Sequence, residues 1–269
     1  MKKALLALMS GGGGNVIPSP LILTWYNSLA VKPSNALLTS LNTLAEGLDA
    51  DANWAKLDLF GLVAGMETDE QRLRPLITTS GDDFVISGVP VLNANGIRNA
   101  GGAGYLDLKW NPTDDGSQYS INSAFISTQI GSAASPGFGT AYYMGSADTA
   151  SFGDSYFTDT EGGALTGTIN DDGGMVNPQI TNVTSTFYTA IVLTGGNKIL
   201  YKNATTNTVA FAAPVLINLD FFGCNASVDG APVGSAEDSY LRHFMAGAGT
   251  ANQTTIQSRL NTFYAARGL

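Results

Sequence analysis

The sequence contains one cysteine and one histidine, and this scarcity excludes several kinds of site. A single cysteine, Cys224, cannot form an internal disulfide or supply the thiolates of a cysteine-based zinc site. It lies in residues 219–224 (LDFFGC), a run typical of a strand. We therefore expect a buried apolar thiol there and not a nucleophile.

Basic charge is also scarce. The chain has 13 Lys and Arg against 22 Asp and Glu, a net charge of −9, and its basic residues are scattered singly. Proteins that bind phosphate backbones or anionic membranes need a concentrated positive face, so we expect neither nucleic acid nor membrane as a partner. No apolar run is long enough to cross a bilayer.

Charged residues make up 13% of the chain, about half of the usual share, and Gly, Ser, Thr, Asn and Ala take their place. Such a surface is typical of β-rich extracellular or virion proteins. The hydrophobic share of 44% still allows a full core.

The first residues resemble a secretory signal, but the apolar run 4–9 is shorter than the ~7–15 residues that such signals need. Four consecutive glycines, Gly11 to Gly14, follow it. A segment of this composition has little tendency to fold alone. We expect residues 1–30 to form an extended arm that anchors the chain on a neighbouring subunit.

Residues 31–80 are expected to form a small helical connector. Ser34 or Asn35 can cap a helix in which leucines recur at positions 37, 41, 44 and 48. A second apolar stretch, residues 57–63, is interpreted as another helix packed on the first.

A clearer helix closes the sequence. Thr250 can act as N-cap, with Gln253 three residues later as in a capping box. Ile256, Leu260 and Phe263 then form one apolar stripe, and Gly268 is placed to end the helix.

Residues from about 82 to 247 favour β structure throughout. Short runs that alternate or are continuously apolar are separated by Gly, Asn, Asp and Pro clusters, and Gly195-Gly196-Asn197 predicts a tight hairpin. The expected strands are residues 84–87, 105–110, 121–126, 142–144, 187–193, 198–201, 209–211, 215–219 and 240–244. The pattern predicts a mainly β chain in which residues 81–269 form an antiparallel β-sandwich or jelly roll with a closing C-terminal helix.

Three local patterns, in this order, resemble a family of tailed-phage virion proteins that carry a concanavalin A-like (laminin-G-like) jelly roll. They are the helical lead-in with Leu38, Leu41 and Leu44 followed by residues 54–58 (WAKLD), the segment 104–112 (GYLDLKWNP), and the ending 244–247 (FMAG) with helix 250–264 and residues 267–269 (RGL). Together they span about residues 35–269. No metal or catalytic motif of such domains can be matched residue by residue.

The resemblance implies a structural protein of a bacteriophage virion, such as a head fibre, capsid decoration, tail or collar component. Residues 1–30 would contact other virion structural proteins, and the chain would form a homo-oligomer, for which a trimer is one arrangement. The exposed sandwich would serve adhesion, with host-surface glycans as partners. The alternative is a carbohydrate-binding lectin or a glycan-active enzyme on the same sandwich.

Catalytic chemistry finds little support in the sequence. The acidic pairs Asp82/Asp83, Asp114/Asp115 and Asp171/Asp172 all lie beside Gly in expected turns, where Asp accepts backbone hydrogen bonds. Glu67, Glu70 and Glu161 have polar, loop-like surroundings. No acidic residues alternate along a strand as a glycosidase site on this fold would require.

A serine hydrolase would have to use His243, which lies in a β-like run without a Gly-x-Ser-x-Gly motif. We therefore interpret His243 as structural and predict that the chain is not an enzyme, with no catalytic, cofactor-binding or metal-binding residue assigned.

Two binding chemistries stay open. Asn170, Asp171 and Asp172 offer hard oxygen ligands, so Ca²⁺ is a possible cofactor, although the spacing of a defined calcium loop is absent. Tyr142-Tyr143, Tyr156-Phe157 and Trp110 could line a sugar platform. Aromatic residues that alternate along strands are more often half-buried in a core, and we favour that interpretation.

Overall fold

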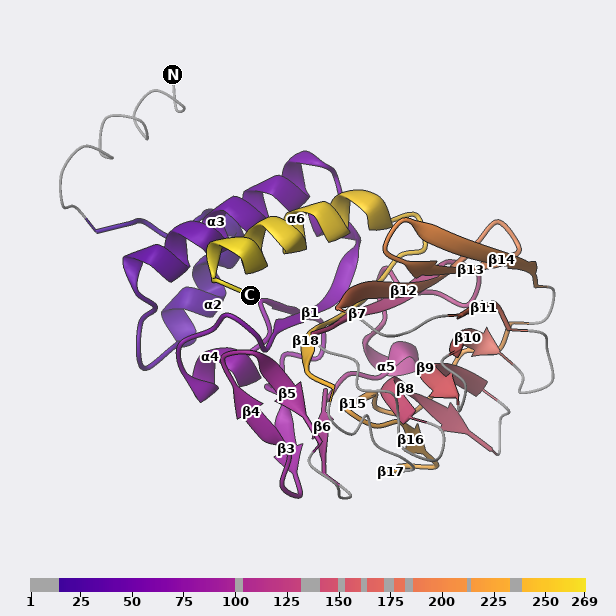
Figure 1. Ribbon diagram of the computed structural model, residues 1–269. Coiled ribbons are helices and arrows are strands. Elements are labelled where there is room, and N and C mark those ends of the chain that lie inside the picture. The colour runs from indigo at the N-terminus through magenta and orange to yellow at the C-terminus, as the bar shows by residue number, and fades with distance from the viewer. Residues whose placement is uncertain are drawn as a thin grey trace.

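The computed structural model describes residues 15–99, 104–131, 141–149, 153–160, 164–171, 177–181, 186–211, 214–232 and 239–269. These residues form three layers: a pair of long helices, a first β-sheet, and a second β-sheet (Figure 1). The first sheet lies in the middle and is covered on both faces.

The middle sheet, here sheet A, contains nine strands. In spatial order they are β14 (Thr205–Ala210), β13 (Asn197–Lys202), β12 (Phe187–Thr194), β7 (Ala124–Ile130), β18 (Leu241–Gly247), β1 (Leu57–Leu62) and β2 (Ile77–Thr78), with β5 (Gly96–Arg98) beside β18 and β4 (Val91–Asn93) beside β5.

The outer sheet, here sheet B, also contains nine strands. In spatial order they are β11 (Gln179–Thr181), β10 (Ala164–Asp171), β9 (Gly153–Thr160), β8 (Ala141–Asp148), β15 (Phe222–Gly223), β6 (Tyr105–Asp107) and β3 (Val85–Ser87), with β16 (Ser227–Val228) beside β8 and β17 (Ala231–Pro232) beside β16. The described strand pairs are antiparallel apart from β16 with β8.

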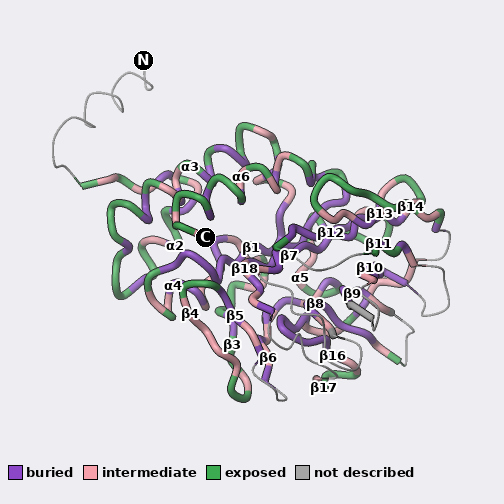
Figure 2. The backbone as a smooth tube through the Cα atoms, in the orientation of Figure 1, coloured by how far each residue is buried: buried purple, intermediate pink, exposed green. Residues whose placement is uncertain are grey.

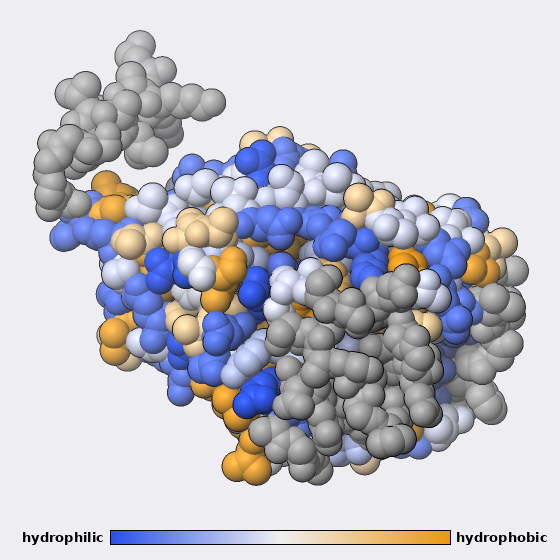
Figure 3. All heavy atoms as spheres, viewed as in Figure 1, coloured by the Kyte–Doolittle hydropathy of each residue, from blue (hydrophilic) through white to orange (hydrophobic). Residues whose placement is uncertain are grey.

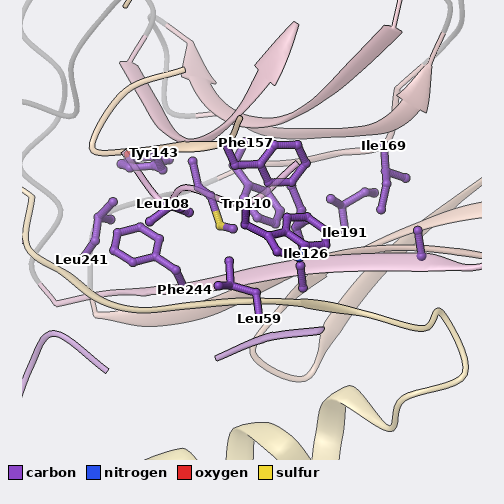
Figure 4. Packing of buried hydrophobic residues seen from close by; sticks show 14 of the residues in the cluster. Leu59, Leu108, Trp110, Ile126, Tyr143, Phe157, Ile169, Ile191, Leu241 and Phe244 are labelled. Atoms are coloured by element: carbon purple, nitrogen blue, oxygen red, sulfur yellow. The ribbon is translucent and has the colours of Figure 1, made fainter. Parts of the chain in front are cut away.

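The main core fills the space between the sheets. Figure 4 shows Tyr143, Phe157 and Ile169 of sheet B facing Ile126, Ile191 and Phe244 of sheet A. Trp110 is fully buried among them, with its ring edge-on to Tyr119 and Phe221 at centroid distances of 5.5 and 5.4 Å. Such edge-to-face contacts add to the free energy that burial of the rings already contributes.

A second core lies between sheet A and the helices. Alternate residues of each central strand point to opposite faces, so in β18 Phe244 joins the main core while Met245 joins the helical one. The helices are η1 (Pro20–Ile22), α2 (Leu23–Ser28), α3 (Asn35–Ala50), η2 (Trp54–Lys56), α4 (Asp69–Leu73), α5 (Pro112–Asp115) and α6 (Gln253–Ala266). Figure 2 shows the central strands buried along their length, whereas the outward sides of α3 and α6 are exposed.

Both predicted long helices are present. Ser34 caps α3 by accepting a hydrogen bond from the backbone nitrogen of Leu37, and the four leucines at the predicted positions are buried. In α6 the predicted apolar stripe is buried, but the cap is Asn252, whose side chain accepts from Thr255, and not Thr250. Asn252 lies directly before the first helical residue, which is where a capping side chain can reach the free N–H groups.

The prediction of an extended arm over residues 1–30 is wrong for its described part, and residues 1–14 lie outside the described residues. Residues 20–28 are helical, and Ile22, Trp25 and Leu29 are buried in the helical core. Their spacing of three and four residues is the helical period, which places all three on one face.

The segment 57–63, expected to be a helix, instead contains strand β1. This strand pairs with β18 on one side and β2 on the other, so it is a central strand of sheet A. A short apolar run is compatible with either structure, and here the partners of the strand decide. The expected division between a connector ending at residue 80 and a sandwich beginning at residue 81 therefore does not separate two structural units.

Residues 215–219 were also expected to form a strand and do not. Their polar groups bond to separate elements instead of a neighbouring strand: Val215 N donates to Asn170 O near the end of β10, and the carbonyl of Ile217 accepts from Thr113 Oγ1 of α5. The predicted hairpin is confirmed, because β12 ends at Thr194 and β13 begins at Asn197, with Gly195 and Gly196 both at positive φ.

The fold class is confirmed as mainly β, with two antiparallel sheets in a sandwich and a C-terminal helix. Among the described residues, no helix has both the length and the apolar character needed to span a bilayer. Exposed large hydrophobic residues include Val85, Ile86 and Val89, and Figure 3 shows apolar side chains gathered at the end of the molecule where β3 lies.

Candidate functional site

The structure divides the aromatic residues considered for a sugar platform into two groups. Trp110, Tyr143 and Phe157 are buried between the sheets and belong to the main core (Figure 4). Tyr142 and Tyr156 are only partly buried. The second group is therefore available for contacts with another molecule.

Strand register places Tyr142 and Tyr156 on the outer face of sheet B. Phe157 points into the core, so its neighbours Tyr156 and Thr158 point away from it. Thr158 pairs with Tyr142 across β8 and β9, which sets both tyrosines on the same face. Their ring centroids are 5.3 Å apart with the planes at 70°.

Asp154 lies two residues before Tyr156 on β9 and thus on the same face. Burial, followed by the charge of Asp154, raises the pKa of both Tyr142 and Tyr156. Both phenols therefore keep their proton at neutral pH and can donate as well as accept hydrogen bonds. We call Tyr142, Asp154 and Tyr156 the tyrosine face.

Aromatic and charged groups continue across the neighbouring strands. Phe222 of β15 and Tyr156 of β9 are both in register with Gly145, one on each side of β8, and Tyr105 stacks on Phe222 at 4.2 Å. Gly145 has a φ of +133°, and a Cβ there would meet the carbonyl oxygen of Ser155 at 2.0 Å. The position between the two rings thus requires glycine.

Acidic groups lie beside the stacked rings. Asp107 forms a 2.7 Å ion pair with Lys109. Burial and the charge of Asp107 raise the pKa of Asp220. This end of sheet B thus combines ring surfaces with carboxylates, a set that can bind hydroxyl groups and C–H faces. Sequence reasoning missed Asp154, although the alternation of Asp154 with Tyr156 is the signal of a shared strand face.

The nucleophile and base candidates lie elsewhere. His243 is fully buried on the helical side of sheet A, where its Nδ1 lies 3.1 Å from Tyr264 Oη and its ring stacks near Tyr188. Burial, then the charge of Arg242, lowers the pKa of His243 to about 3. Cys224 is buried, and burial raises the pKa of its thiol. Neither residue is brought to the tyrosine face.

Of the acidic pairs, Asp114 and Asp115 lie in a short helix and not in a turn, and Asp115 accepts the expected backbone hydrogen bond. The helix is α5, and the bond from the backbone nitrogen of Asn111 is 2.8 Å long. The expectation for Asp171 is wrong. It is buried at the end of β10 in an ion pair with the buried Lys198, while Asp172 lies outside the described residues.

Asp82 and Asp83 border a surface hollow of about 680 Å³ between α2 and the segment that follows α4. Arg74 in this hollow is engaged by Asp83 at 2.8 Å and by Glu70 at 3.6 Å. The cation is thereby neutralised by its own neighbours, which makes the hollow a weak site for an anionic ligand.

The expected loop glutamates hold the chain together locally. Glu70 accepts from the backbone of Ala30 and Val31, and these bonds lower its pKa. Glu67 accepts from the backbone of Ser34. Both tie residues 30–34 to the region of α4, and Glu161 lies outside the described residues.

The oxygen atoms considered for Ca²⁺ have other partners. Asn170 accepts from Tyr119 Oη at 2.9 Å and donates to the carbonyl oxygens of Ser120 and Ile121. Asp171 binds Lys198. In the part of the chain that the structure describes, no group of three or more His, Cys, Asp and Glu residues is placed to hold a metal ion.

No family model matches the sequence, and no curated protein resembles it in sequence. Solved structures do share its fold. A sialidase of Trypanosoma rangeli, in complex with 2,3-difluorosialic acid, matches 86% of this chain at 10% identity and a TM-score of 0.54, and the match covers 40% of the sialidase.

Two toxin structures match similarly. The binding domain of botulinum neurotoxin DC, in complex with SialylT, has 13% identity and a TM-score of 0.51 over 78% of this chain and 51% of that one. The binding domain of botulinum neurotoxin serotype D has 11% identity and a TM-score of 0.52 over 77% and 51%. The chain thus spans about half or less of these proteins, and the likeness is one of fold.

These comparisons define the class as a β-sandwich shared by sialidases and toxin binding domains. They correct the prediction that the chain is not an enzyme, because the sialidases that share this fold are enzymes and the lack of a sequence motif therefore excludes nothing. The sandwich implied by the phage resemblance is confirmed, whereas its phage origin finds no support in these structures.

Proposed function

We propose that the chain is a glycan-binding β-sandwich domain whose binding site is the tyrosine face. The observation that carries this proposal is the Tyr142–Tyr156 pair, partly exposed and 5.3 Å apart, with Asp154 beside it on one sheet face. Tyrosine offers a rigid apolar ring for the C–H face of a sugar and a hydroxyl for its polar edge. A carboxylate accepts hydrogen bonds from sugar hydroxyls.

Two structures with this fold support the proposal, since one contains a sialic acid derivative and the other SialylT. The charge of this chain points to a different sugar. Asp154 lies beside the two tyrosines, and Asp107 and Asp220 lie close to each other next to the stacked rings, with Lys109 paired to Asp107. We infer that the site takes neutral, hydroxyl-rich glycans and disfavours sialylated ones, because like charges repel.

We expect weak binding by one copy and stronger binding by an assembly that presents several copies. Presentation on a virion, attachment through the amino-terminal region and a homo-oligomer such as a trimer are the further parts of this proposal. They rest on the sequence resemblance. Attachment through the amino-terminal region is tested with a shortened chain. Because residues 20–29 help to form the helical core, that chain should lack only residues 1–14.

The binding proposal is tested by screening the full chain against an array of neutral and sialylated glycans, followed by titration of the best ligand. Tyr142→Ala and Tyr156→Ala are each expected to weaken binding about tenfold, since one stacked ring contributes roughly 1–1.5 kcal/mol. Tyr156→Phe keeps the ring and isolates the contribution of its hydroxyl.

Asp82→Ala is the control, because Asp82 is exposed and borders the hollow beside α2 instead of the tyrosine face. It should leave binding unchanged. Binding that survives both tyrosine changes, or that is lost in Asp82→Ala, would move the site away from the tyrosine face. Release of sugar products measured in the same mixtures shows whether the bound glycan is also cleaved.

A further inference from the structure

Lys198 is a fully buried lysine held by two side chains that also lie near the core. Its Nζ donates to Asp171 Oδ2 and, at 2.7 Å, to Asn177 Oδ1. The ring of Phe211 lies 4.2 Å from the same nitrogen. A primary amine, an amide and a carboxylate therefore meet inside the sandwich.

The three groups come from both sheets. Lys198 belongs to β13 of sheet A, while Asp171 ends β10 and Asn177 precedes β11, both of sheet B. Figure 1 shows β13 beside β10 and β11 at one end of the sandwich. A bond formed at this place would join the two sheets.

Lys198 and Asp171 form a buried pair that carries a desolvation cost. Removing an ammonium and a carboxylate from water costs several kcal/mol each, and their attraction does not always offset that cost. Transfer of one proton from Lys198 to Asp171 neutralises both groups and frees the amine lone pair. Asp171 Oδ1 is buried without a hydrogen-bond partner among the described residues, so it is placed to carry that proton.

The closeness of the amine to the amide also promotes a reaction between them. The amine touches the amide oxygen of Asn177, which places the amide carbon next to the nucleophile, and the folded chain keeps them together. Reactions between groups held in this way behave as if the partner were present at very high concentration. The protonated Asp171 can stabilise the negative charge that develops on the amide oxygen.

We propose that Lys198 and Asn177 form an intramolecular amide bond, promoted by Asp171. The Nζ–Cγ bond forms and the Cγ–Nδ2 bond of Asn177 breaks. Of the three ammonium protons, one passes to Asp171, one leaves with the amide nitrogen, and one stays on the new amide. The nitrogen departs as ammonia, no oxidant or cofactor is needed, and Asp171 ends neutral.

The bond would fasten β13 to the segment before β11 and thereby prevent the sheets from separating at this end. A cross-link of this kind stabilises a fold chiefly by restricting the unfolded chain. The proposal is independent of glycan binding, since none of its groups belongs to the tyrosine face.

The test is the intact mass of the denatured full chain. We expect the mass of the sequence minus one ammonia, and a proteolytic digest should contain a branched peptide that joins Asn177 to Lys198. A chain of full sequence mass without the branched peptide would overturn the proposal. This measurement needs no variant, so it does not depend on how a variant folds.

Two variants test whether Lys198 and Asp171 are required for the loss of ammonia. Lys198→Arg keeps a cation for Asp171 but lacks the amine, and Asp171→Asn removes the proton acceptor, so both should have their full sequence mass. Asn95 precedes Gly96 and could also lose ammonia by cyclising on its own backbone. That loss would persist in Lys198→Arg, and its persistence there would contradict the amide bond.

Discussion

The carboxylate of Asp58 accepts a 2.6 Å hydrogen bond from the backbone nitrogen of Tyr119, a residue far along the chain. The same carboxylate accepts from Ser117 and Gln118, so three consecutive N–H groups converge on it. Asp58 lies on the central strand β1 and is 1% exposed. This one side chain therefore fixes the loop that leads into β7.

We predict that Asp58→Asn lowers the free energy of unfolding by about 1–3 kcal/mol. The amide has nearly the same shape, but its NH₂ group would face backbone donors and leave at least one of them unsatisfied. Urea denaturation at neutral pH measures the loss. Asp49→Asn on the exposed side of α3 is the matched control and should stay within about 0.5 kcal/mol of the wild type.

For Asn252 and Thr250, the two candidate N-caps of α6, we predict different effects of substitution. Asn252→Ala should cost about 1 kcal/mol, because its side chain satisfies the free N–H of Thr255. Thr250→Ala should change little, since the role of Thr250 in the structure is played by its backbone oxygen, which accepts from Lys56. Equal losses in the two variants, measured by thermal unfolding, would argue against Asn252 as the cap.

The hairpin between β12 and β13 depends on backbone conformation. Gly195 and Gly196 have φ values of +57° and +74°, which suits a two-residue turn. Gly196→Val should destabilise the protein by about 1–2 kcal/mol, because a β-branched residue is strained at positive φ. Gly195→Asn should be nearly neutral, since asparagine tolerates this region, and a larger loss there would contradict the turn geometry.

The sequence predicts those parts of this fold whose signals are local. The leucine spacing of α3, the apolar stripe of α6 and the glycine pair of the hairpin each depend on neighbours within a few residues. The strand nature of residues 57–62 is not local. It depends on β18, which lies far along the chain and supplies the hydrogen bonds.

The sequence likewise predicts only part of the candidate site, because the rest depends on residues far apart in the chain. That aromatic residues occur in alternating strands can be seen in the sequence, but which ring faces outward depends on register, including the irregularity between Tyr142 and Met144. The nearby Gly173 predicts a turn at Asp171. The actual partner of Asp171, Lys198, lies on the other sheet, and no sequence spacing relates the two.

The last prediction concerns acid stability and His243. Burial, with the nearby charge of Arg242, lowers its pKa to about 3, whereas an unfolded histidine titrates near 6.5. Between these values the unfolded chain binds a proton that the folded chain does not, so stability falls as pH decreases through this window. The contribution of the neutral His243 side chain to the free energy of unfolding is therefore fully present above about pH 6.5.

His243→Asn removes the titrating group while placing an amide near the hydroxyl of Tyr264. The variant should be less stable at pH 7, because the smaller side chain leaves a void between Tyr188 and Tyr264. From pH 7 to pH 5, however, the wild type should lose about 2 kcal/mol more than the variant, or roughly 1.4 kcal/mol per pH unit below 6.5. Urea midpoints at both pH values measure this difference. Because the carboxylates are common to both proteins, parallel profiles would show that folding does not lower the pKa of His243.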